Sequence, residues 1–583
     1  MILRVDHMPA IQYQTPKTEK GFRSLWDVTA LIIILGALAA LAFAANRISS
    51  PYQLGQPIAI SLDPIHLPGY AANTVLRMLI ALVFSFIFTL VIAPLAAKNK
   101  HAEKLLLPLI DILQSVPILG FLSITVVAFI ELFPNSLWGP ECAAIFAIFT
   151  SQVWNMTLSF YQSLRTVPAE FYDTAAIFHL SKWQQFWRIE LPYAAPGLIW
   201  NAMVSLSAGW FFVVASEALS VSNQQVLLPG IGSYISVAIE QANLTAIFYA
   251  ITAMLIVILT YDQLLFRPLL TWAERFRIGS AEDAVFSQSW FYKILAKTRW
   301  LKIVKYFFDG LSDFILNPPT LKYPIPHRLT LSARYTRLLL WFWNSILLMS
   351  VVFVFIFLWD FIADTILLTE ILHVFYLGAI TALKVAVLIA IASLIWVPVG
   401  VWIGIHPKAS HIIQPVTQFL AAFPVNLVYP IVVTGIVHFE LNIEIWSMPL
   451  MILGTQWYIL FNVIAGATAI PKELRLATKS LGVKRWLWWK RLALPAIFPF
   501  YVTGSMTAAA GCWNASIVAD VLEWGNHKLV ATGLGSYIVE HTASGDFPRI
   551  SLGITVMCLY VLTINHLIWR KLYNFAIHRF VLG

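Results

Sequence analysis

Long runs of apolar residues recur along the chain, separated by short polar segments. A helix that crosses the hydrocarbon core of a bilayer needs roughly 20 such residues. The runs are continuous rather than alternating, which favours helices over the strands of a closed barrel. We therefore predict twelve membrane-spanning helices, near residues 26–46, 72–97, 105–131, 139–164, 194–220, 244–266, 337–358, 376–402, 412–437, 447–468, 498–522 and 547–569.

The composition agrees with a membrane protein. Of the 583 residues, 59% are hydrophobic and only 11% are charged, whereas soluble domains carry about 25% charged residues. The cysteines at positions 142, 512 and 558 are far apart in the sequence. They indicate neither a disulfide framework nor a metal site. The polar first 25 residues do not have the form of a cleavable signal peptide.

The basic residues are concentrated in alternate loops. Of the 38 Lys and Arg residues, only Arg47 and Lys528 lie in the predicted outer loops. The predicted inner segments hold 33 of the 38, and these segments are 1–25, 98–104, 165–192, 267–337, 403–411, 469–495 and 570–583. Because basic loops stay on the cytoplasmic side, we predict a multi-pass membrane protein with both termini cytoplasmic. The net charge of +9 then faces anionic lipid and cytoplasmic partners, and no nucleic acid is expected.

The chain contains an internal repeat. At a constant offset of 303, residues 166–196 match 469–499, and the hexapeptide GIGSYI at 230–235 matches GLGSYI at 533–538. Matching segments fall on the same side of the membrane by the count of basic residues. This indicates two parallel six-helix halves with a pathway between them. The predicted fold class is therefore an all-α polytopic membrane protein.

The repeat divides the chain into four parts. We expect a cytoplasmic arm at 1–25, half 1 at 26–266, a basic cytoplasmic linker at 267–336 and half 2 at 337–583. Within the linker, aromatic and aliphatic residues recur at helical spacing beside several basic residues. This pattern predicts an amphipathic helix in the inner interface. Its role is either to anchor the linker or to dock a regulatory partner.

Each half contains a polar inner loop that is predicted to form helix, turn and helix before a Leu-Pro pair. The loops, at 166–192 and 469–495, contain DTAAIFHLSKWQQFWRIELP and LATKSLGVKRWLWWKRLALP. They resemble the EAA loop of ABC-importer membrane subunits, whose pattern is Glu-Ala-Ala, a Gly after three more residues, and Leu-Pro thirteen residues after the Gly. The resemblance covers both halves and implies a protein of the bacterial inner membrane. It implies the type I ABC-importer permease fold, in which this loop is the coupling helix that docks on a cytoplasmic ATPase.

The two loops depart from that pattern in different ways. In the first loop, Asp173 takes the Glu position and His179 the Gly position, whereas the second loop has Leu476 and Gly482 there. Gly suits a helix end with positive φ better than His does, so we expect unequal docking surfaces. The residues that the resemblance assigns to ATPase coupling are Glu170, Asp173, Ala175, His179, Lys182, Trp183, Arg188, Glu473, Ala477, Gly482, Lys484, Arg485, Trp486 and Arg491. The alternative is that both loops only anchor on lipid phosphates.

The sequence has no G-x-x-x-x-G-K-[ST] motif, which is the loop that cradles nucleotide phosphates. We also find no metal cluster and no catalytic constellation in the sequence. We therefore expect a transport subunit rather than an enzyme, with no catalytic residue and no cofactor of its own. ATP and Mg are expected on separate ABC ATPase subunits, in two copies. The resemblance also implies an extracytoplasmic substrate-binding protein as a partner.

Three stretches narrow the resemblance. They are NTVLRMLIALVF, LLPLIDILQSVPILGFL and GWFFVVASEAL, and they are similar to permeases of the nitrate, sulfonate, taurine and bicarbonate group. This implies a small anion as substrate. An ion-gradient-driven secondary transporter with six plus six helices stays open as an alternative, and so does a membrane scaffold or lipid-handling protein.

Four charged residues lie in or beside the predicted spans at matching places of the two halves. Arg77 and Lys384 lie near the outer start of the second helix, and Glu217 and Asp520 lie late in the fifth. A charge inside the bilayer costs about 2.5 kcal/mol or more, which makes such residues functional candidates. The cations either face the pathway and attract an anion or extend to the outer headgroups. We expect them to pair with Glu217 and Asp520 across the pathway.

Pro117 and Pro424 interrupt the third predicted helix of each half at matching positions. Proline removes a helix hydrogen bond and disfavours helical backbone in the preceding residue. The interruption either allows a bend or frees backbone groups that bind an ion in the pathway. We expect a bend.

Overall fold

The computed structural model describes residues 58–115, 117–221, 224–276, 289–298 and 366–580, with single residues between 29–42 and 345–361. Helices dominate this part of the chain, which has an all-α polytopic membrane fold. Seven of the helices described there are long and apolar enough to cross a membrane, and one bent pair is an eighth candidate. The N-terminal arm and most of the linker lie outside the described residues, as does most of each of the predicted spans 26–46 and 337–358.

Half 1 and the start of the linker are built from helices with one small hairpin. Their elements are a 3-10 turn (Pro64–His66), α2 (Leu67–Lys98), α3 (Lys100–Ser115), α4 (Ile118–Leu132), α5 (Trp138–Arg165), α6 (Ala169–Ile177), α7 (Lys182–Gln185), a π-helical turn (Phe186–Glu190), α8 (Leu191–Glu217), β1 (Ala218–Val221), β2 (Gln224–Leu227), α9 (Ile231–Glu240), α10 (Leu244–Tyr261), a π-helical turn (Asp262–Phe266), α11 (Arg267–Ala273), a 3-10 turn (Glu274–Phe276) and α12 (Trp290–Lys297).

Half 2 repeats this order. Its elements are α15 (Leu368–Ile405), α16 (Pro407–Ala422), a 3-10 turn (Val425–Leu427), α17 (Tyr429–His438), α18 (Ile443–Leu453), α19 (Gln456–Thr468), α20 (Lys472–Ser480), α21 (Arg485–Trp488), a π-helical turn (Trp489–Ala493), α22 (Leu494–Ala519), β3 (Val521–Trp524), β4 (His527–Val530), α23 (Leu534–Ser544), α24 (Phe547–Ile564), a π-helical turn (Asn565–Trp569) and α25 (Arg570–Phe580).

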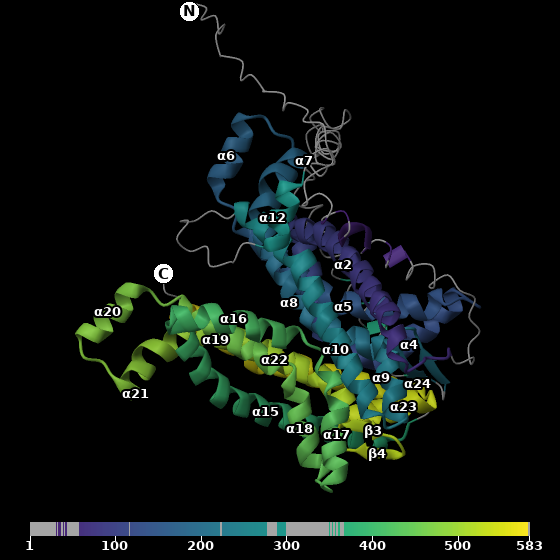
Figure 1. Cartoon of the computed structure of the whole chain (residues 1–583). Coiled ribbons are helices and arrows are strands. Elements are labelled where there is room, and N and C mark those ends of the chain that lie inside the picture. The colour runs from purple at the N-terminus through teal and green to yellow at the C-terminus, as the bar shows by residue number, and fades with distance from the viewer. Residues whose placement is uncertain are drawn as a thin grey trace, which may run out of the picture.

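The offset of 303 found in the sequence also relates the two folds. The two antiparallel hairpins have the same register, with Ala218 opposite Leu227 and Val521 opposite Val530. The π-helical turns lie at equivalent places in both halves. In Figure 1 the halves meet where α4, α9, α23 and α24 lie, and they diverge toward the ends that carry α6 and α20. The internal duplication is therefore a property of the structure as well as of the sequence.

The third predicted span of each half is interrupted, as the prolines predict. In half 1, α3 ends at Ser115 and α4 begins at Ile118, directly after Pro117. In half 2, Pro424 precedes a 3-10 turn that leads into α17. The predicted span over 447–468 is bent rather than straight, because α18 and α19, which together form the eighth candidate span, meet there at an angle of 43°. Gly454 and Thr455 separate the end of α18 from the start of α19.

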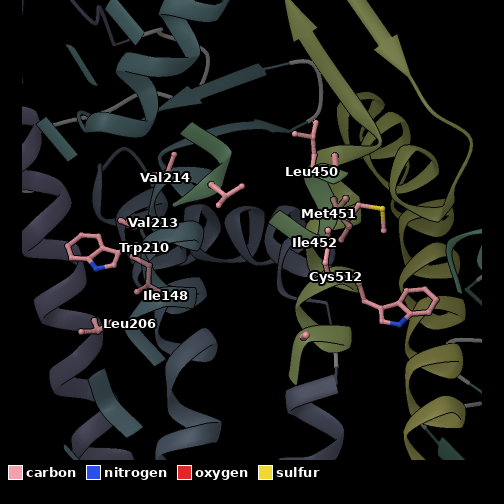
Figure 2. Close-up of a cluster of buried hydrophobic side chains, with 14 of the residues drawn as sticks. Ile148, Leu206, Trp210, Val213, Val214, Leu450, Met451, Ile452 and Cys512 are labelled. Carbon is pink, nitrogen blue, oxygen red and sulfur yellow. The ribbon is translucent and has the colours of Figure 1, made fainter. Parts of the chain in front are cut away.

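One buried apolar cluster extends through both halves. Figure 2 shows part of it, with Trp210 and its neighbours from half 1 and Cys512 and its neighbours from half 2. Trp210 meets Tyr261 edge to face at 5.3 Å between ring centroids, and its repeat partner Trp513 contacts Tyr560 at 6.3 Å. Burial of these large aromatic surfaces holds α8 against α10 and α22 against α24.

Candidate functional site

Arg77 on α2 is the centre of a buried charge cluster in half 1. Its Nη1 lies 2.7 Å from Glu217 Oε1 at the end of α8, and its Nε lies 2.6 Å from Glu141 Oε2 at the start of α5. Its Nη2 donates to Glu141 Oε1 at 2.6 Å and to the Pro229 carbonyl at 3.1 Å. The three charged side chains are at most 1% exposed. The fork of the guanidinium therefore joins three helices.

The glycines of GIGSYI make room for the Glu217 carboxylate. A Cβ at Gly230 would lie 2.3 Å from that carboxylate, and a Cβ at Gly232 would lie 2.2 Å from the Val214 carbonyl oxygen. Without those Cβ atoms, Gly232 N–H donates to Glu217 Oε2 at 2.7 Å. Thr74 donates to the other carboxylate oxygen, also at 2.7 Å. Glu217 is thereby held at the N-terminus of α9, where the helix dipole favours a negative charge.

Half 2 has an equivalent but looser cluster. Lys384 Nζ lies 3.3 Å from Asp520 Oδ1 and 3.6 Å from Glu444 Oε2, and it donates to the Thr532 carbonyl at 2.7 Å. Thr532 in turn donates to Glu444 through its backbone N–H and its hydroxyl. The Glu444 side chain is 42% exposed, whereas Lys384 and Asp520 are buried. Only half 1 therefore shields all three charges from water.

The expected partners are confirmed, but the expected position of the pairs is corrected. Arg77 pairs with Glu217 and Lys384 with Asp520, each inside its own half rather than across a pathway between halves. Arg77 is buried in protein and does not extend to the headgroups. Sequence reasoning missed Glu141 and Glu444. The offset of 303 relates these two residues, and both lie in the first turn of equivalent helices.

The two polar loops fold as predicted, as helix, turn and helix. α6 and α7 form the first, and α20 and α21 form the second, each at the far end of its half (Figure 1). His179 has a φ of 49° and Gly482 a φ of 66°. His179 thus adopts the same left-handed turn as Gly482, although His is less suited to it. The difference in residue type does not change the shape of the turn.

Most residues assigned to coupling are exposed on these loops. Ala175 is the exception, because it is 2% exposed. Large apolar side chains project at both turns, with Phe178 71%, Leu481 79% and Trp486 71% exposed. The exposed assigned residues are Glu170, Asp173, His179, Lys182, Trp183, Arg188, Glu473, Ala477, Gly482, Lys484, Arg485, Trp486 and Arg491. Exposed apolar groups of this size are typical of surfaces that bind a partner.

The first loop has an ion pair at its base that the sequence analysis did not find. Lys98, the last residue of α2, lies 2.7 Å from the carboxylate of Glu190, whose side chain is 3% exposed. The Lys98 ammonium also lies 5.2 Å from the ring centre of Phe186. The equivalent of Glu190 in half 2 is Ala493. There, Arg475 instead donates to the carbonyl of Ala467 at 2.8 Å.

Within the described ranges, no group of three or more His, Cys, Asp or Glu residues is placed to hold a metal ion. Two segments match one protein-family model, residues 85–265 and 396–570. The model is that of the binding-protein-dependent transport system inner membrane component. The chain belongs to this family. Each match lies within one half of the repeat and includes one of the two polar loops.

Individual members of the family are similar to parts of this permease. The nitrate import permease protein NrtB of Leptolyngbya laminosa is 23% identical over 207 residues, which is 34% of this chain and 71% of that protein. The bicarbonate transport system permease protein CmpB of Synechococcus elongatus is 26% identical over 157 residues, 27% of this chain and 52% of the relative. NrtB of Synechocystis sp. is 27% identical over 169 residues, which is 29% of this chain and 56% of that protein. The chain spans about half the length of the latter two.

Proposed function

We propose that this permease is the membrane component of an ATP-driven importer for a small anion such as nitrate or bicarbonate, with alternating access between its two fused halves. The two exposed loops, α6–α7 and α20–α21, carry the proposal. They lie at equivalent ends of both halves and expose large apolar side chains. The similarity to nitrate and bicarbonate permeases supports the anion class.

The energy source in this proposal is a separate pair of ABC ATPase subunits that bind ATP and Mg. The sequence itself has no phosphate-cradling motif. An extracytoplasmic binding protein delivers the anion, in keeping with the description of the family. Both termini and the basic linker lie on the cytoplasmic side, where the ATPase docks, because the basic residues are concentrated there.

The test is uptake by proteoliposomes that contain the permease with its cognate ATPase and, where the operon encodes one, its binding protein. The panel comprises nitrate, bicarbonate, an alkyl sulfonate and taurine. We expect ATP-dependent accumulation of at least one of these anions and none with a non-hydrolysable ATP analogue. Accumulation driven by an ion gradient without ATP would overturn the proposal in favour of a secondary transporter.

Docking of the ATPase on the loops is tested with charged substitutions at exposed apolar residues. Phe178→Asp and Leu481→Asp place a charge on the first and the second turn. Phe439→Asp is the matched control, because Phe439 is 70% exposed but lies beyond the end of α17, in a predicted outer loop. We expect the first two variants to lose the ATPase during purification and the control to retain it. Equal retention by all three variants would contradict the docking.

A further inference from the structure

Among the described residues, three hydrogen bonds made by side chains join the two halves. Tyr458 on α19 lies 2.8 Å from the Ser207 hydroxyl on α8. Asn426, in the turn after Pro424, donates to the Phe211 carbonyl on α8 at 3.2 Å. Asn514 on α22 accepts from the Ile118 N–H at 2.8 Å. We call the four polar residues Ser207, Asn426, Tyr458 and Asn514 the seam.

The broken helices create two of these contacts. The Ile118 N–H has no partner within α4 because it lies in the first turn after Pro117, and Asn514 from the other half accepts it. Asn426 follows the equivalent Pro424 and bonds to Phe211, the repeat partner of Asn514. Each interrupted helix thus meets the long helix of the other half at the same position. The interruption therefore does more than allow the expected bend, because it joins the halves.

The seam is not symmetric, although the halves are. The repeat partners of its residues are Ala510 for Ser207, Leu119 for Asn426, Asn155 for Tyr458 and Phe211 for Asn514. In a dimer of two identical subunits, the two equivalent positions would have to carry the same residue. Because the halves are fused in one chain, they can differ at equivalent positions. A hydroxyl or amide of one half can therefore contact a group of another type in the other half.

The seam has no fixed positive charge. Arg77 and Lys384 are buried in ion pairs within their own halves, so they are not available to an anion between the halves. Ser207 donates to the Val204 carbonyl at 2.7 Å, which leaves Tyr458 as the donor to Ser207. Asn426 Oδ1 is buried without a hydrogen-bond partner in the described structure. The polar side-chain groups of the seam are two hydroxyls and two amides.

We propose, on the basis of the proposed function, that Ser207, Asn426 and Tyr458 select a small monovalent oxyanion as it passes between the halves. These groups bond across the interface when the halves are in contact. When the halves part, the Tyr458 hydroxyl and the Asn426 amide lose their acceptors and can donate to a ligand between the halves. An oxyanion accepts hydrogen bonds from both. Neutral donors bind it weakly enough for release.

The test compares Tyr458→Phe and Asn426→Leu with the parent and with Ser205→Ala. Tyr458→Phe keeps the ring and removes only the hydroxyl, whereas Asn426→Leu installs the residue found in the other half. Ser205 is the control because it lies on α8 but bonds to Asn155 within half 1, and its own repeat partner is Ala508. The measurements are the KM and Vmax of ATP-dependent uptake for each anion, the ATPase rate without substrate, and the melting temperature.

We expect the two seam variants to raise KM about tenfold, the effect of losing one good hydrogen bond. We also expect them to change the ranking of the anions while the ATPase rate and melting temperature stay near those of the parent. The Ser205→Ala variant should behave as the parent does. An unchanged KM and ranking in both seam variants would overturn the proposal.

A failure of the proposed function is recognised separately, because the parent itself would then import no anion. In that case, stabilisation of the detergent-purified chain by nitrate or bicarbonate tests the seam directly. Stabilisation of the parent that is lost in Tyr458→Phe and Asn426→Leu supports the seam. No stabilisation of the parent, or equal stabilisation of the variants, overturns it.

Discussion

The guanidinium of Arg77 lies 2.7 Å from the carboxylate of Glu217, and both belong to half 1. This ion pair stabilises half 1 internally and does not link the two halves. With Glu141 it fixes the predicted outer ends of α2, α5 and α8 and the start of α9. Under the proposed alternating access, each half moves as a unit while the hydrogen bonds between the halves break and re-form.

Arg77→Met removes the cation and leaves Glu141 and Glu217 buried close together. We expect the free energy of unfolding to fall by about 3–5 kcal/mol, the cost of breaking a buried pair. Unfolding by denaturant in detergent micelles measures it. Arg549→Met is the matched control, because Arg549 is 31% exposed and its loss is expected to cost much less. Equal losses in the two variants would contradict the importance of burial.

Glu141→Gln and Glu444→Gln compare the repeat partners directly. Glu141 is 1% exposed and takes two hydrogen bonds from Arg77, whereas Glu444 is 42% exposed and 3.6 Å from Lys384. We expect a loss of about 3 kcal/mol for the first variant. The second should lose at most about 1 kcal/mol, since water screens the pair. A larger loss from Glu444→Gln in the same unfolding assay would refute this order.

Gly482→Ala tests the left-handed turn between α20 and α21. The added methyl group meets no atom within 4 Å, so the cost comes from the φ of 66° alone. We expect the loop to lose about 1 kcal/mol, seen as roughly fivefold faster hydrogen exchange in α20 and α21. Gly435→Ala is the control, because it also meets open space but lies within a helix of ordinary φ. Its exchange should slow or stay unchanged.

Lys98→Met tests the ion pair at the base of the first loop. It leaves the buried Glu190 carboxylate without its cation. We expect a loss of about 1–2 kcal/mol, below the full value for a buried pair because Lys98 is 43% exposed. Hydrogen exchange should accelerate in residues 182–190 and not in α20 and α21. Lys472→Met, an exposed change on α20, should leave residues 182–190 unaffected. Unchanged exchange there in Lys98→Met would rule out a tethering role.

Asp546→Asn tests a pH-dependent contribution at the start of α24. Burial acts to raise the pKa of Asp546, but hydrogen bonds and charge attraction from Arg549 outweigh it and hold the pKa below its usual value. A depressed carboxyl pKa adds stability that is complete above the unfolded pKa and is lost as the pH falls through the folded pKa. Asn keeps the helix cap. Glu540→Gln, an exposed change on α23, serves as control.

We expect Asp546→Asn to lower the melting temperature at about pH 6. The difference from the parent should shrink as the pH falls through the depressed pKa of Asp546, where the parent carboxylate also becomes protonated. The control should follow the parent at every pH. A constant difference between Asp546→Asn and the parent over this range would show that the charge of Asp546 contributes nothing.

Much of the site was predictable because its residues recur at equivalent positions in the two halves of the sequence. The offset of 303 located both loops and matched Glu217 with Asp520, and an offset of 307 matched Arg77 with Lys384. The same offset relates Glu141 to Glu444, so this signal was present but not used. Lys98 and Glu190 gave no such signal, since Ala493 has no charge to match.

The sequence by itself determined the membrane class, the two halves, the polar loops and the interrupted third helices. These follow from local rules, namely the length of apolar runs, the distribution of basic residues and the missing N–H of proline. Only the tertiary structure decided which charges meet. Arg77 joins Glu217 at a sequence separation of 140, and Ser207 meets Tyr458 from the other half. Such contacts depend on how helices pack against one another, which the periodicity of a single helix does not encode.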